Sequence, residues 1–560
     1  MDALGSEILR IAFPATLALV ADPVASLIDT TFIGHLGTVE IAAVGVSIAI
    51  LNQALRITVS PLVSMTTSFV AEEDAIARLA KEVQKKNNEI PKVKAEDVIA
   101  ADTMEKGSPA TESEYKEVKE DNAIQTNSKV QNVDSTTKPM VNQAITREKR
   151  HIPSASTSLV MGLVVGILQT IFLISLAKPL LKIMGVRSES PMLEPAISYL
   201  RIRSLGIPAM LLYLAMQGVF RGFKDTTTPL YAIVAGDLAN VILDPILIFV
   251  CRMGVSGAAV AHVLSQYLIL VILLCKLMQQ VYIIPPSYKS MQFSRFLKNG
   301  FYLLGRVIVA TSCATLATSL AARLGSTPMA AFQICLQVWM TSSLLAFGLA
   351  GGGQAIIACA LAEKDYQKAA SAASRVLQMA FVLSLGLALV VGLGLQYGSV
   401  VFTRDKHVLR IITIAIPFVA ATQPINNLAF AFDGLYYGAS DFLYSTYSMV
   451  IAVILSIASL LLLAKSNGFA GIWLALSIFM SLRVFAGVLR DWNWTLALSQ
   501  EPLDNKTVEF DIPVKTSGSS LFTLDFISEI ETRAQNSRTN KRITQCLRLA
   551  LIFASFKTCN

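Results

Sequence analysis

The sequence predicts an all-α integral membrane protein with twelve transmembrane helices, arranged as two six-helix lobes around a central cavity. Three observations predict this class. The 560 residues are 53% hydrophobic and only 15% charged, whereas a soluble domain carries roughly 25% charged residues. The apolar residues fall in long blocks, and a block of about 20 can cross the hydrocarbon core as a helix. Short motifs of the first half recur in the second half.

Twelve segments are long and apolar enough to be transmembrane helices. In chain order they are residues 8–34, 40–70, 157–184, 191–220, 226–250, 255–280, 296–322, 327–361, 369–396, 407–437, 442–464 and 468–489. The lipid bilayer is therefore the expected surrounding of most of the chain. The short loops on the same side of the membrane as the N-terminus carry more Lys and Arg than the loops on the opposite side. This bias predicts that both termini are cytosolic.

Residues 73–156 interrupt this pattern with a long polar segment. It has too few apolar residues to offset the entropy cost of ordering it, so we expect a disordered cytosolic loop. Its first part, "AIARLAKEVQKKN", can continue the preceding helix. Two functions are open for the loop: a passive linker, or a regulatory loop whose Ser and Thr residues are recognised by a kinase or another partner.

Two pairs of motifs indicate an internal repeat. "QGVFRGFKD" (217–225) matches "DGLYYGASD" (433–441) at an offset of 216, which pairs Gly218 with Gly434. "GHLGTVEIAAVGV" (34–46) matches "ARLGSTPMAAFQI" (322–334) at an offset of 288. The offsets differ by 72 residues, and the extra length of the first half contains the polar loop. Two six-helix halves in the same orientation are an architecture of secondary transporters.

The repeat predicts the domain organisation. We expect N-lobe helices 1 and 2 in residues 1–72, the polar loop in 73–156, N-lobe helices 3 to 6 in 157–282, an inter-lobe linker in 283–295, C-lobe helices 7 to 12 in 296–490, and an atypical C-terminal tail in 491–560.

Acidic residues inside the apolar segments are candidates for cation coupling. Asp29 stands in the apolar run "SLIDTTFIGHLG", and an aspartate at a helix centre costs about 2.5–3.5 kcal/mol. A carboxylate shielded from water can bind a proton instead of staying charged. Asn240 and Asp244 share one face of helix 5, and Pro245 should loosen the helix and free backbone carbonyls there. These oxygens suit a proton or Na⁺; alternatively, Asp29 only caps a helix end.

Buried polar residues of the second half are candidates for substrate binding. Arg306 lies within the apolar run "FYLLGRVIVATSCATLA", and a guanidinium group in a cavity suits a carboxylate. The alternatives are an ion pair with a nearby acid or contact with a lipid headgroup. The candidate substrate-binding residues are Arg306, Gln333, Gln337 and Asn426.

Several function classes are not supported by any motif. The seven cysteines and four histidines show no metal-ligand spacing, and we find no nucleophile motif or phosphate-binding loop. We therefore expect neither an enzyme nor a bound cofactor or metal. The net charge of +8 is modest for this length, and we expect no nucleic-acid partner.

Several motifs resemble the multidrug and toxic compound extrusion (MATE) family over residues 6 to 490. They are "LIDTTFIGHLG", "QGVFRGFKDTTTPLYA", "NVILDPILIF" and "FDGLYYGASD". The resemblance implies two lobes in a V around a central cavity, and antiport driven by H⁺ or Na⁺. The family's N-lobe cation cluster corresponds to Asp29, Asn240 and Asp244. The tail departs from the family pattern, and its apolar run "CLRLALIFASF" is too short to span a membrane.

The long loop and "PLVSMTTSFVAEED" before it make the chain similar to the plant citrate-exporting branch. That similarity implies export of citrate across the plasma membrane, in aluminium tolerance or iron movement. Two other functions remain open at this point: an exporter of organic cations or flavonoid-like compounds, and a non-transporting membrane scaffold that acts through loop 73–156.

Overall fold

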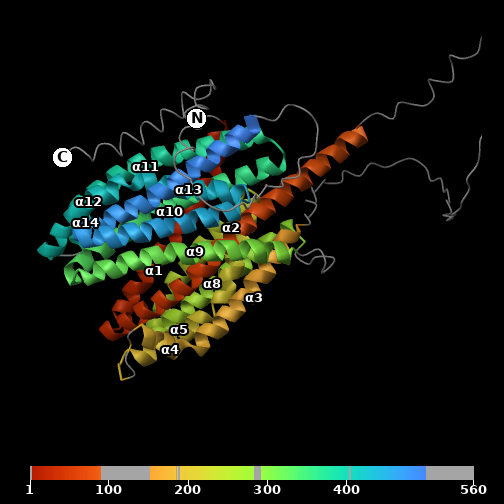
Figure 1. Cartoon of the computed structure of the whole chain (residues 1–560). Helices are drawn as coiled ribbons and strands as arrows, with labels where there is room; N and C mark the ends of the chain where they lie inside the picture. Colours follow the sequence, from red (N-terminus) through yellow and green to blue (C-terminus); the bar gives the residue numbers. More distant parts are fainter. Residues whose placement is uncertain are drawn as a thin grey trace, which may run out of the picture. The chain divides into compact units, whose positions relative to one another are not determined.

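The computed structural model describes residues 3–89, 152–282 except 185, 187 and 188, 292–402 and 405–499. This part of the chain is built of helices, most of which lie alongside one another (Figure 1). They are α1 (Ala3–Gly34), α2 (Thr38–Glu89), α3 (Pro153–Ser175), α4 (Ala177–Ile183), α5 (Leu193–Ser204), α6 (Ile207–Gly222), α7 (Thr227–Pro245), the π-helical turn η1 (Ile246–Val250), α8 (Gly254–Gln280), α9 (Phe293–Arg323), α10 (Ser326–Ala362), α11 (Tyr366–Phe402), α12 (Lys406–Ala421), α13 (Gln423–Gly438) and α14 (Phe442–Ser499).

The described helices account for twelve membrane crossings. Nine are long and apolar enough to span on their own, and two bent pairs, α5 with α6 and α12 with α13, bring the number to eleven. The twelfth comes from α14, which has 58 residues and would be about 87 Å long at 1.5 Å per residue. That is far more than the ~30 Å hydrocarbon core. Its backbone is non-helical at Gly468 (φ 56°, ψ −126°), where it divides into two spans.

Two hydrophobic cores correspond to two lobes. One core uses only residues between Ala18 and Val281, and a second uses only residues between Cys313 and Met480. We refer to α1–α8 as the N-lobe and to α9–α14 as the C-lobe. A third core joins them: the Phe69 ring of α2 lies 5.0 Å from that of Phe296 and 5.9 Å from that of Phe442.

The internal repeat is visible in how the glycines pack. Gly218 of α6 lies against α2, where an added Cβ would stand 3.0 Å from the carbonyl oxygen of Val63. Gly434 of α13 lies against α10, where an added Cβ would stand 2.5 Å from the carbonyl oxygen of Ala350. The glycines paired by sequence therefore make the same close helix contact in each lobe, as small residues do at membrane helix interfaces.

The predicted boundaries of the polar loop differ from the structure at both ends. α2 continues to Glu89, and its end projects beyond the other helices (Figure 1). α3 begins earlier, at Pro153, because proline is favoured in the first helical turn. The Glu73 carboxylate accepts hydrogen bonds from the backbone N–H and the hydroxyl of Ser154 (3.0 and 2.7 Å) and from the amide of Gln292 (2.8 Å). The predictions for residues 90–151 and 500–560 lie outside the described residues.

The lobe boundaries shift by a few residues as well. α9 begins at Phe293, inside the predicted linker, and α14 continues to Ser499, past the predicted end of the C-lobe helices. The Gln292 backbone N–H donates to the Thr157 hydroxyl at 3.2 Å. This contact ties the start of α9 to the start of α3.

Polar contacts join α2 to the C-lobe along one stretch, which we call the α2 seam. The Gln354 amide of α10 donates to the Ser64 carbonyl (2.7 Å) and to the Ser68 hydroxyl (2.8 Å). The Ser68 hydroxyl donates to the Tyr437 carbonyl at 2.5 Å. Glu72 and Arg295 form an ion pair at 2.6 Å. The seam closes the lobes against each other near the start of the polar loop.

Candidate functional site

The N-lobe holds a cluster of acidic and amide side chains on α1 and α7. Asn240 and Asp244, four residues apart, project from one face of α7 and are at most 1% exposed. The Asn240 amide donates to Asp29 Oδ1 at 2.5 Å and approaches Asp244 Oδ2 at 3.5 Å. All three residues proposed for cation coupling are thus brought together. After Pro245 the helix changes to the wider π-turn η1, as expected from the proline.

The two acids of this cluster share one amide. Asn240 lies within 3.5 Å of an oxygen of each, and the Asp29 and Asp244 carboxyl groups interact electrostatically. Two neighbouring carboxylates repel each other unless a proton or a cation lies between them. Asp244 Oδ1 and Asn240 Oδ1 are buried and have no hydrogen-bond partner among the described residues. The cluster therefore has the oxygen atoms and the spacing to hold a proton or a small hard cation.

Three further residues surround the cluster that sequence reasoning did not assign to it. His262 Nδ1 of α8 lies 3.5 Å from Asp29 Oδ2. Arg203 of α5 interacts electrostatically with both acids, and Tyr199 of the same helix interacts electrostatically with Arg203 and with both acids. A histidine inside an apolar helix was the available signal for His262. Arg203 could not be assigned to the cluster beforehand, because the packing of α5 cannot be read from its sequence.

The C-lobe holds a second buried polar cluster, which contains Arg306. This residue of α9 is 7% exposed. Its guanidinium group forms an ion pair with Asp433 and donates hydrogen bonds to the Tyr437 hydroxyl and to the Ser445 carbonyl (3.2 Å). The alternative of an ion pair with a nearby acid is therefore what the structure shows for Arg306.

A second arginine, which sequence reasoning missed, completes this cluster. Arg483 of α14 is 8% exposed and pairs with the other oxygen of Asp433 at 2.6 Å. We call Arg306, Asp433 and Arg483 the C-lobe triad. Arg483 stands in "SLRVFAGVLR", close to the predicted end of the last span. Its position near the end of a span is typical of an arginine that contacts lipid headgroups. Only the packing of α13 against α14 reveals that its partner is Asp433.

The other three proposed substrate-binding residues do not join the triad. Gln333 and Gln337 are exposed on α10, and the contacts of Arg306 do not include them. Asn426 is fully buried and donates to the Ser343 hydroxyl at 2.7 Å. The 3.6-residue period placed Gln333 and Gln337 on one face correctly, but it could not tell which neighbour that face meets.

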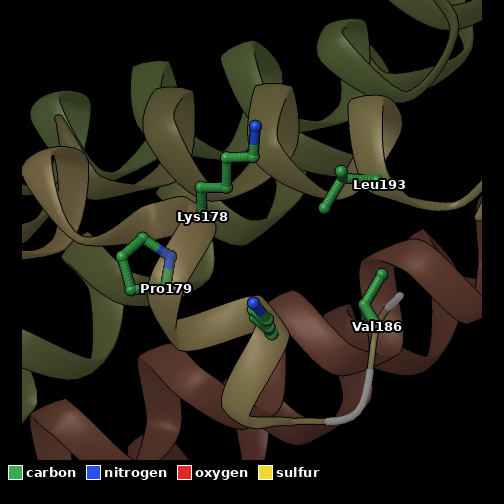
Figure 2. Close-up of a pocket in the computed structure, with 5 residues that line it drawn as sticks. Lys178, Pro179, Val186 and Leu193 are labelled. Carbon is green, nitrogen blue, oxygen red and sulfur yellow. The ribbon is translucent and has the colours of Figure 1, made fainter. Parts of the chain in front are cut away.

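A surface cavity of about 290 Å³ lies apart from both clusters. It is lined by Lys178, Pro179, Lys182, Val186 and Leu193, from α4, the following turn and the start of α5 (Figure 2). Neither the acids of the N-lobe nor the C-lobe triad line it. The polar clusters, and not this cavity, carry the candidate chemistry.

The fold and the two clusters define a class of protein. Twelve crossings in two repeated lobes, with buried ionisable groups in each lobe, are the architecture of a secondary transporter. The sequence model of the family described as MatE matches residues 137–246 and 303–461. The chain is 56% identical over 491 residues to Protein DETOXIFICATION 42 of Arabidopsis thaliana, covering 87% of this chain and 92% of that protein.

Two further similarities agree with this match. Protein DETOXIFICATION 44, chloroplastic, of Arabidopsis thaliana is 42% identical over 487 residues, covering 87% of this chain and 82% of that protein. A MATE transporter of Vibrio cholerae, solved in a bent form, superposes with a TM-score of 0.69 at 15% identity, over 88% of this chain and 98% of that chain. The chain belongs to the MATE family, whose members are multi-pass membrane transporters and not enzymes.

Proposed function

We propose that this chain exports citrate from the cytosol in exchange for protons. The observation that carries the antiport is the bridge that the Asn240 amide forms between Asp29 and Asp244. A ligand shifts a conformational equilibrium only by its different affinity for the two states. The acids sit on separate helices, α1 and α7. A movement of one helix against the other would change how tightly the pair holds a cation. Na⁺ in place of H⁺ is the alternative coupling ion.

Citrate as substrate is supported by two features. The motifs before the polar loop resemble the citrate-exporting branch, and two arginines lie buried in the C-lobe against one aspartate. Excess positive charge in a buried site favours an anion and disfavours an organic cation. Export of organic cations or flavonoid-like compounds therefore has less support, and a scaffold has no need of paired acids inside its helices. The physiological setting that we propose is aluminium tolerance or iron translocation.

The plasma membrane is the proposed location, and the polar segment predicted over residues 73–156 is the proposed site for a kinase or another regulatory partner. One similar protein carries the word chloroplastic in its name, so a plastid envelope is the competing location. Imaging of a fluorescent fusion in plant cells distinguishes the two membranes. The same fusion, compared with and without phosphatase treatment, reports whether the loop is phosphorylated.

Citrate efflux from proteoliposomes tests the proposal. We expect the wild-type chain to move labelled citrate when a pH gradient is imposed, and the Asp29→Asn variant to insert normally but to fall to the rate of empty liposomes. Asp225→Asn is the matched control, because Asp225 binds the start of α7, accepting from the backbone N–H groups of Thr227 and Thr228 and from the Thr228 hydroxyl. Wild-type rates in the Asp29→Asn variant would refute the coupling role. A response to Na⁺ but not to pH would change the coupling ion.

A further inference from the structure

The C-lobe triad carries more positive than negative charge. Arg306 and Arg483 both bind Asp433, one at each carboxylate oxygen. Both arginines also interact electrostatically with the Asp433 carboxylate. Both arginine side chains are 8% exposed. A buried charge without a matching partner is costly, and such residues inside a membrane protein mark a functional site.

The cluster keeps unused hydrogen-bonding capacity at Arg483 and Tyr436. Arg306 uses all three of its nitrogen atoms on Asp433, Tyr437 and Ser445. Arg483 uses one nitrogen on Asp433 and a second on the Met480 sulfur at 3.0 Å, and a thioether is a weak acceptor. Among the described residues, its Nε has no hydrogen-bond partner, and neither does the buried hydroxyl of Tyr436. Tyr436 interacts electrostatically with all three members of the triad.

Aromatic rings lie beside Arg483. The guanidinium carbon lies 5.0 Å from the ring centroid of Phe430 and 5.6 Å from that of Phe479. Phe430 in turn packs against Phe347, with ring centroids 4.3 Å apart, and Phe347 of α10 is 43% exposed. A ligand that enters from the exposed face of α10 would pass this aromatic pair before it reached Arg483.

We propose that the C-lobe triad with Tyr436 is the site that binds a carboxylate of the exported anion, and that Asp433 competes with this carboxylate for the two arginines. The chemical class of ligand is a compact polycarboxylate. One ligand carboxylate would take the unused Nε of Arg483 and the Tyr436 hydroxyl, and would share the arginine forks with Asp433. Arg–carboxylate pairs of this kind are bidentate and specific. This inference rests on the proposed export of an organic anion and assigns its binding residues.

Binding of citrate to the purified full-length chain in detergent, measured by titration calorimetry, tests this site. We expect Arg483→Gln to raise the citrate Kd at least tenfold, and Tyr436→Phe to raise it about threefold without altering the fold. Asp433→Asn removes the competitor, so the Kd should fall severalfold. Arg410→Gln, at an exposed arginine of α12, is the matched control and should leave the Kd unchanged.

Three results would overturn the site. Equal citrate affinity in the wild type, Arg483→Gln and Tyr436→Phe would make the triad purely structural. Weaker binding in Asp433→Asn, with Tyr436→Phe unaffected, would show that Asp433 only holds the arginines in place. Displacement of citrate by chloride alone would show that the site binds a halide and not a polycarboxylate.

Transport assays separate this inference from the proposed function. If wild-type liposomes export an organic cation such as tetraethylammonium and no citrate, the proposed function fails and the site fails with it. If wild-type and Arg483→Gln liposomes export citrate with the same KM, only the site fails.

Discussion

At the scale of single residues, one amide links the two acids of the N-lobe cluster. Asn240 is 1% exposed, and its side-chain NH₂ group reaches an oxygen of Asp29 and an oxygen of Asp244. A hydrogen bond to a charged group contributes about 1.5–3 kcal/mol. Loss of this amide would leave the two carboxyl groups without the donor that orients them.

We predict that Asn240→Leu slows pH-driven citrate efflux by about tenfold or more, since 1.4 kcal/mol corresponds to a factor of ten. Citrate exchange between two compartments of equal pH should continue, because it needs no net proton movement. Asn240→Gln keeps the amide and should recover part of the pH-driven rate. Both rates come from labelled citrate flux in the same liposomes. Full pH-driven efflux in the leucine variant would exclude the amide from coupling.

The residues of the N-lobe cluster show how far a sequence can predict a site. Asp29, Asn240 and Asp244 could be singled out because a charge in an apolar run has a high cost and because a four-residue spacing fixes a shared helix face. That they form one cluster was implied by the family resemblance. His262 and Arg483 could not be assigned a role, because their relevance depends on which helices pack together. Neither periodicity nor hydropathy carries that information across more than 200 residues of chain, as between Asp29 and His262.

At the scale of helices, α10 packs against helices of both lobes, with α1, α2, α11 and α13 among its neighbours. Its glycines allow this. Gly352 is buried, and an added Cβ there would stand 3.3 Å from the Ile8 carbonyl of α1. Gly434 of α13 likewise lets α13 approach α10 closely. The glycine-rich run "GLAGGGQA" (348–355) lies inside α10 and serves close helix packing.

We predict that Gly434→Ala destabilises the chain, because the new methyl group would meet the Ala350 carbonyl of α10. Overpacking of this kind costs typically about 1–3 kcal/mol, which should lower the midpoint of thermal unfolding in detergent. Gly386→Ala is the matched control: it lies on α11 with nothing within 4 Å of an added Cβ. Alanine should raise stability slightly there, since glycine is a poor helix former. Equal midpoints in both variants would contradict the close contact.

At the scale of the whole molecule, the lobes are held together by the α2 seam. The Gln354 amide is the buried link, because it satisfies the Ser64 carbonyl and the Ser68 hydroxyl at once. The Glu72–Arg295 pair is about one third exposed and should contribute less than about 1 kcal/mol. Opening the protein on this side therefore depends mainly on Gln354. Cys359 lies in the same contact, with its sulfur 3.5 Å from the Ala71 carbonyl.

We predict that Gln354→Leu exposes Cys359. Unpaired buried polar groups cost about 1–3 kcal/mol, so the population with an open seam should rise on the order of tenfold. The measurement is the rate of maleimide labelling in a chain that keeps Cys359 as its only cysteine. Gln378→Leu, at an exposed glutamine of α11, should leave the rate unchanged. A chain that keeps only Cys335, inside the C-lobe core, should stay unlabelled throughout. An unchanged Cys359 rate would mean that Gln354 does not hold the seam.

Glu73 fixes the point at which the chain returns after the long polar insertion. One carboxylate on α2 binds Ser154 at the start of α3 and Gln292 just before α9. The start of α3 is thus held against α2, well before α2 ends at Glu89. Each doubling of the length of a flexible loop costs only about 0.6 kcal/mol of closure entropy. The length and the sequence of this insertion can therefore change in evolution without a change in the membrane-spanning helices.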